Sequence, residues 1–134
     1  MQPDHSFTLH DLAHFPIVLF RSEAATPGYA ALWQQEMDAL LAQGRPFVLL
    51  FPDGRAEEEH EDRKQRALWL KQNREGLAAL CLSLITVEPD AGKRLALEAQ
   101  SAMAARAFGI PMAVSPSPQQ AHAMAQALIA ASTA

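Results

Sequence analysis

The sequence predicts an α/β fold in which a four-stranded, mainly parallel sheet is flanked by about four helices. Four short apolar runs, at residues 17–20, 47–51, 82–87 and 110–114, are each separated from the next by one amphipathic segment of helix length. This alternation favours a parallel sheet, because a crossover helix covers one sheet face while it returns the chain to the starting edge. The length of 134 residues suits one domain over residues 1–134, since two separate cores would each be marginal.

The N-terminal residues 1–14 are expected to form a polar segment. Within it, residues 8–11 have the spacing of a capping box, which predicts a short helical turn. His5, His10 and His14 would share one face only if the whole segment were helical. Because Pro16 and the first strand follow at once, a solvated segment is the preferred interpretation and no metal site is predicted.

The first strand, residues 17–20, starts directly after Pro16, where a proline is tolerated. A helix is then expected from Thr26 and Pro27, with its apolar stripe formed by Trp33, Met37, Leu40 and Leu41. It should end at Gly44, which can adopt the left-handed conformation. Residues 47–51 show no alternation of apolar and polar side chains, which indicates a central strand covered on both faces.

The other crossovers also carry helix signals. An acidic stretch at residues 57–59 leads into a long helix that should reach about Leu80. Asp90 can cap an alanine-rich helix that ends at Phe108, before Gly109. The last helix is expected from Pro118, with Ser117 and Gln120 as its capping box.

Composition excludes several classes of partner. A net charge of −4 and a pI near 5.7 give no reason to expect nucleic acid or an anionic membrane surface. No apolar stretch approaches the roughly 18 residues of a membrane span, and residues 1–15 lack the pattern of a signal peptide. We therefore expect a cytoplasmic protein without a membrane span. Cys81 is the single cysteine and is predicted to be a buried core residue.

The apolar stripe of the long second helix contains charged residues. Leu70, Leu77 and Cys81 share a narrow sector, and Arg63 and Arg66 lie in or beside it. Because burial of an unpaired guanidinium costs several kcal/mol, three interpretations remain open. The arginines form ion pairs with acidic residues, extend past the sheet into solvent, or line a ligand cavity.

The carboxyl ends of parallel strands are where open sheets bind ligands. In this sequence those ends carry a polar rim of mixed charge. We therefore predict a ligand-binding site at this edge, formed by Asp53, Arg63, Arg66, Glu88 and Ser115. No nucleotide loop, catalytic triad or metal-ligand cluster stands out, so we assign no catalytic residue, metal or cofactor.

The order of elements, with Pro27-Gly28-Tyr29 opening the first helix, Val87-Glu88-Pro89 closing the third strand and a final helix over residues 119–128, resembles the SpoIIAA-like branch of STAS/SEC14-type domains. This resemblance implies a small cytoplasmic α/β domain, often dimeric, with a regulatory or ligand-sensing role. The chain departs from the family at residues 52–55, Pro-Asp-Gly-Arg, where the phosphorylatable serine motif would stand. Switching by serine phosphorylation is therefore not expected.

We expect a cytoplasmic regulatory or binding module without enzymatic activity. Its candidate partners are another protein, a small anionic ligand and a second copy of the chain in a homodimer. The alternative is a small enzyme or anion-binding protein that uses the carboxyl edge of the sheet.

Overall fold

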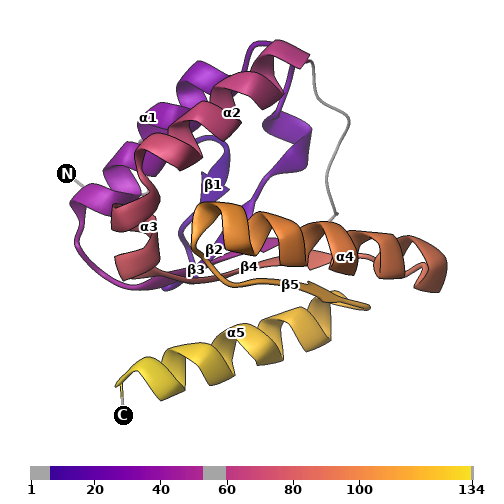
Figure 1. Cartoon of the computed structure of the whole chain (residues 1–134). Coiled ribbons are helices and arrows are strands. Elements are labelled where there is room, and N and C mark those ends of the chain that lie inside the picture. The colour runs from indigo at the N-terminus through magenta and orange to yellow at the C-terminus, as the bar shows by residue number, and fades with distance from the viewer. Residues whose placement is uncertain (1–6, 53–59, 134) are drawn as a thin grey trace.

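The computed structural model describes residues 7–52 and 60–133 and has the expected α/β architecture (Figure 1). Its sheet has five strands in the order β1-β2-β3-β4-β5. The strands are β1 (His10–Asp11), β2 (Ile17–Phe20), β3 (Phe47–Phe51), β4 (Cys81–Val87) and β5 (Met112–Ser115). Strands β2 to β5 are parallel, and β1 pairs antiparallel with β2. The α/β class is confirmed, but the sheet is mixed and has one strand more than expected.

Within the described residues there are five α-helices, which is one more than expected. They are α1 (Ala30–Ala42), α2 (His60–Gln72), α3 (Arg74–Leu80), α4 (Ala91–Phe108) and α5 (Pro118–Thr133), and a 3-10 turn, η2, covers Ser22–Ala24. The first four helices lie on one side of the sheet and α5 lies alone on the other (Figure 1). This arrangement follows from the strand order, because consecutive parallel strands joined by right-handed crossovers place every connecting helix on the same face.

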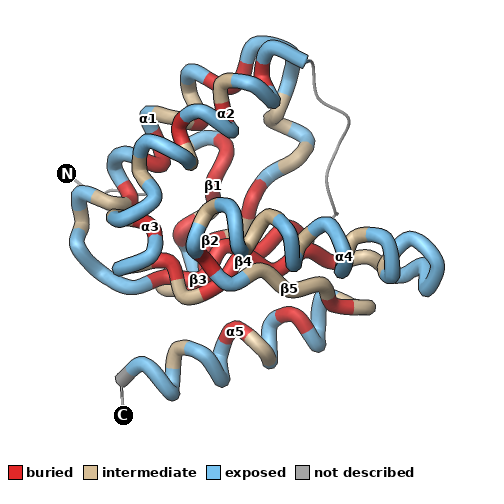
Figure 2. Tube along the Cα trace, in the orientation of Figure 1, coloured by how far each residue is buried: buried red, intermediate tan, exposed pale blue. Residues whose placement is uncertain are grey.

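The central strand β3 is as predicted. It is hydrogen-bonded to β2 on one side and to β4 on the other, and all five of its residues are buried (Figure 2). Phe47, Leu49 and Phe51 contribute to the core that also contains Trp33 and Met37 of α1. Alternate residues of the strand, Val48 and Leu50, join the smaller core under α5.

The predicted ends of α4 and the predicted start of α5 are confirmed. The Asp90 side chain accepts a hydrogen bond from the Lys93 N–H at 2.8 Å, and Gly109 ends α4 with φ 73°. The Ser117 hydroxyl accepts from the Gln120 N–H at 3.2 Å at the start of α5. Cys81 is buried as expected, and burial raises the pKa of its thiol to about 12.

The expected helical turn at residues 8–11 is wrong, because His10 and Asp11 form β1. Leu9 and His10 are also 0% and 2% exposed, so this part of the polar segment 1–14 is not solvated. The reason is a long-range contact, since the backbone N–H groups of Thr8, Leu9 and His10 donate to the carboxylate of Glu36 on α1. A local capping pattern cannot reveal such a partner.

The second crossover is not one continuous helix. Asn73 separates α2 from α3, and its side-chain amide donates to the carbonyl of Trp69 at 2.9 Å. The apolar sector expected from a single helix is therefore divided. The buried residues of α2 are Asp62, Arg66 and Trp69, whereas Leu77 is buried in α3.

Candidate functional site

Two of the predicted site residues, Glu88 and Ser115, lie side by side at the carboxyl edge of the sheet. The Glu88 N–H donates to the Ser115 carbonyl at 2.8 Å. The Ser115 hydroxyl donates to the Ser117 carbonyl at 3.0 Å, and the Glu88 carboxylate accepts from the Asp90 N–H at 3.1 Å. These polar groups therefore connect the strand ends to the helices that follow.

A cation also lies at this edge. The Arg94 guanidinium donates through Nη1 to the carbonyls of Glu88 and Pro89, both at 3.1 Å. Sequence reasoning did not single out Arg94, although it lies in the first turn of a helix that starts at a strand end.

Arg66 lies in a different part of the fold from this edge. It is 8% exposed, and its guanidinium carbon is 5.1 Å from the centre of the Trp33 ring on α1. Arg63 is exposed on α2, and Asp53 lies outside the described residues. Of the five predicted residues, the structure thus places Glu88 and Ser115 in contact and Arg66 in the interface between α1 and α2.

The same interface explains the polar residues on the buried side of α2. Asp62 accepts hydrogen bonds from the N–H groups of Gly28 at 2.8 Å and Ala30 at 3.1 Å, at the start of α1. The indole N–H of Trp69 donates to Asp38 at 2.9 Å. Asp62 and Trp69 therefore hold α2 against α1.

A buried acid–base pair joins β1 to α1. The Nδ1 atom of His10 is 2.8 Å from Oε1 of Glu36. Burial alone would raise the pKa of Glu36, but the hydrogen bonds from His10, Thr8 and Leu9 and the charge of His10 outweigh it and lower the pKa below 4.5. The sequence contained a signal for this buried acid, because Glu36 falls beside Met37 on the apolar stripe of its helix.

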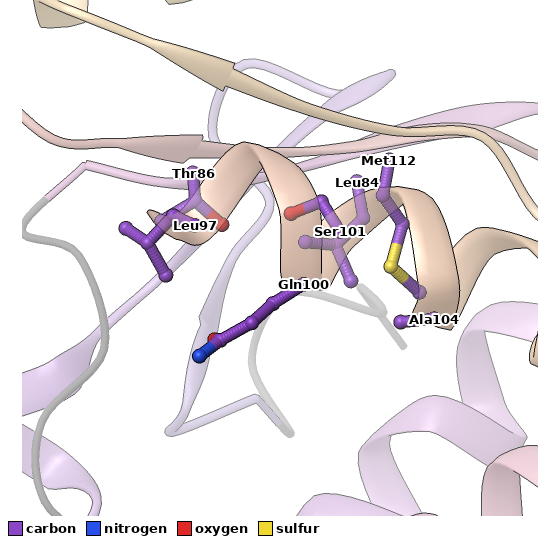
Figure 3. A pocket seen from close by; sticks show the side chains of 7 residues that line it. All are labelled: Leu84, Thr86, Leu97, Gln100, Ser101, Ala104 and Met112. Carbon is purple, nitrogen blue, oxygen red and sulfur yellow. The ribbon is translucent and has the colours of Figure 1, made fainter. Parts of the chain in front are cut away.

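A hollow of about 90 Å³ lies between α4 and the sheet (Figure 3). Its walls are uncharged and consist of Leu84, Thr86, Leu97, Gln100, Ser101, Ala104 and Met112. In the close-up, the Gln100 side chain extends outward from α4 (Figure 3). The hollow is small beside the roughly 300 to 1,000 Å³ of typical ligand pockets.

The outer side of α4 is unusually apolar for an exposed helix. None of its 18 residues is buried, and Figure 2 shows no red segment along it. Leu95 and Met103 are 70% and 73% exposed. We define the α4 outer face as Gly92, Leu95, Ala99, Ala102, Met103 and Arg106, which share one side of the helix.

A larger groove runs between α5 and the start of β2. Its volume is about 480 Å³. The groove is lined by His14, Pro16, Ile17, His122, Gln126, Ile129 and Ala130. None of the four predicted site residues that the structure describes contributes to it.

Residues 7–52 and 60–133 contain no group of three or more histidine, cysteine, aspartate or glutamate residues that could hold a metal ion. In this same part of the chain, no helix has both the length and the apolar character needed to cross a bilayer. Comparison with protein-family models, curated proteins and solved structures gives no match.

Proposed function

We propose that the protein is a binding module without enzymatic activity, that the α4 outer face is its interaction surface, and that a second copy of the chain binds there. The observation that carries this proposal is the exposure of Leu95 and Met103 on an 18-residue helix that buries none of its residues. Exposed apolar surface of this kind is typical of sites of protein–protein contact.

The α4 outer face is complementary to itself. Leu95 stands four residues before Ala99, and Met103 stands four residues after it. In an antiparallel pair of helices centred on Ala99, each Leu95 therefore meets Met103 of the second copy. Gly92, Ala99 and Ala102 are small enough to let the two helix axes approach to about 8 to 10 Å.

The charges on α4 also favour this pairing. Arg106 stands seven residues after Ala99, so it lies level with Gly92 of the second copy, close to the exposed Asp90. Asp90 caps its own helix through Oδ2. The carboxylate of Asp90 would attract a guanidinium from the second copy at each end of the pair, and this attraction opposes the repulsion from the positive dipole at the start of α4.

The size of the surface indicates a weak dimer. A helix of 18 residues is about 27 Å long, and one face of it covers only part of the roughly 800 Å² that each partner buries in a standard interface. We therefore expect dissociation in the micromolar range. The regulatory role and cytoplasmic location implied by the family resemblance belong to the same proposal.

The alternative of an enzyme or anion-binding protein at the carboxyl edge has less support. At that edge Glu88, Ser115 and Arg94 already bond to neighbouring backbone groups.

Sedimentation velocity over a range of micromolar concentrations tests the proposal. Wild-type protein should show a monomer–dimer equilibrium, and Met103→Glu should shift it to monomer without changing the melting temperature, because Met103 is exposed. Leu68→Glu is the matched control, since Leu68 is 48% exposed on α2. Equal dimerisation of the wild type and Met103→Glu would contradict the proposal, and so would a wild type that stays monomeric.

A further inference from the structure

A single helix covers the lower face of the sheet, and this leaves room beside it. Ala121 and Ala125 of α5 pack into the core with Val48, Leu50 and Ile85 of the central strands. Ile17 and Leu19 of β2 belong to the same face at its margin, and Leu19 is only half-buried. The groove of about 480 Å³ lies where α5 passes the start of β2.

The floor and the rim of this groove differ in chemistry. Pro16, Ile17, Ile129 and Ala130 provide apolar surface. His14 reaches the groove from the segment before β2, and His122 and Gln126 reach it from successive turns of α5. The rim therefore offers imidazole and amide N–H donors from both sides.

The distribution of charge around the groove favours an anionic ligand. None of the seven lining residues is acidic, and the 16 residues of α5 contain no aspartate, glutamate, lysine or arginine. The whole chain, by contrast, has a net charge of −4. An anionic group would thus find donors here without an acidic side chain among the lining residues.

We propose that the groove binds a small amphiphilic carboxylate, with a hydrocarbon body against Ile17 and Ile129 and a carboxylate head between His14, His122 and Gln126. The volume falls within the range of small-ligand sites, and a few polar groups border an apolar surface, as is usual in such sites. This site is separate from the α4 outer face and does not depend on dimer formation.

Octanoate is a suitable probe, and binding can be followed by amide chemical shifts in ¹⁵N-labelled wild-type protein. The shifts should change at Ile17, His122 and Ile129 and should saturate. Octanol has a similar hydrocarbon chain but lacks the negative charge of the carboxylate. It should therefore bind at least about tenfold more weakly than octanoate. Equal binding of octanol would overturn the assignment of the carboxylate head.

Gln126→Glu gives the sharpest variant, because it keeps the size of an exposed side chain and adds a negative charge to the rim. It should weaken octanoate binding at least about tenfold. Gln120→Glu places the same charge on the first turn of α5, outside the lining residues, and should change the affinity by less than about twofold. Equal effects of the two variants, or octanoate shifts confined to other parts of the chain, would overturn the proposal. The Met103→Glu variant should bind octanoate like the wild type, which separates failure of this site from failure of the dimer.

Discussion

The imidazole of His10 and the carboxylate of Glu36 form a buried contact of 2.8 Å that connects β1 to α1. The same carboxylate accepts the backbone N–H groups of Thr8, Leu9 and His10. One acidic side chain thus satisfies three backbone donors that no strand or helix would otherwise pair. It therefore joins the segment that contains β1 to α1.

This contact predicts a defined pH dependence of stability. The pKa of Glu36 is lowered in the folded state, so the folded protein binds fewer protons than the unfolded chain at acidic pH. The contribution of Glu36 is complete above its unfolded pKa and is lost as the pH falls through the folded value. Urea denaturation at about pH 7 and at about pH 3.5 should show wild-type stability falling on acidification.

Glu36→Gln should remove this part of the pH dependence and should destabilise the protein by about 1 to 3 kcal/mol near neutral pH, because it removes a buried carboxylate that accepts the backbone N–H groups of Thr8, Leu9 and His10. Glu75→Gln on the exposed side of α3 serves as the control and should behave like the wild type. Parallel stability–pH curves for the wild type and Glu36→Gln would show that the pair does not act as described.

Asp62 should stabilise the start of α1 from a neighbouring helix. Asp62→Ala leaves the N–H groups of Gly28 and Ala30 without their acceptor and should lower the free energy of unfolding by about 1 to 3 kcal/mol. Chemical denaturation measures the loss. Glu61→Ala changes an exposed neighbour on α2 and should have an effect within about 0.5 kcal/mol. Similar losses in the two variants would count against the capping role.

Arg66 should stabilise the folded protein through its contact with the ring of Trp33. Arg66→Ala removes a buried cation that lies over an indole ring and should destabilise the protein by about 1 to 3 kcal/mol, and tryptophan fluorescence should report the altered surroundings of Trp33. Lys64→Ala is the control, because Lys64 is exposed on the same helix. An Arg66→Ala protein as stable as the wild type would instead favour the ligand-binding role that the sequence suggested.

The parts of the fold that the sequence predicted correctly depend on local signals. The apolar run 47–51 marked the central strand, and Asp90, Gly109 and Ser117 marked helix ends whose caps lie within a few residues. What was missed depends on contacts between distant residues. Glu36 converts an expected turn into β1, and Asp62 of α2 accepts the N–H groups of Gly28 and Ala30 at the start of α1.

The same distinction applies to the candidate site. The sequence correctly brought Glu88 and Ser115 to one edge, because parallel strands end together. It also drew attention to Arg66 as a charged residue on a buried stripe. The sequence could not reveal that this side of α2 packs against α1, because the packing depends on how the helices are arranged on the sheet. The exposed face of α4 was equally hidden, because apolar residues at helical spacing normally indicate a core.

The proposed dimer places the two copies of Ala99 at the crossing point of the paired helices. Helix axes about 8 to 10 Å apart bring facing Cα atoms within the roughly 4 to 7 Å that a disulfide spans. Ala91, in contrast, stands eight residues from Ala99, so its two copies would be about 24 Å apart along the axis. The native thiol does not interfere, because Cys81 is buried.

Mild oxidation of Ala99→Cys followed by non-reducing electrophoresis therefore tests the central claim most directly. The account predicts a disulfide-linked dimer for Ala99→Cys, which reduction reverses, and monomer for Ala91→Cys under the same conditions. It would be contradicted if Ala99→Cys stayed monomeric, or if both variants cross-linked at the same rate, because random collisions would then explain the product.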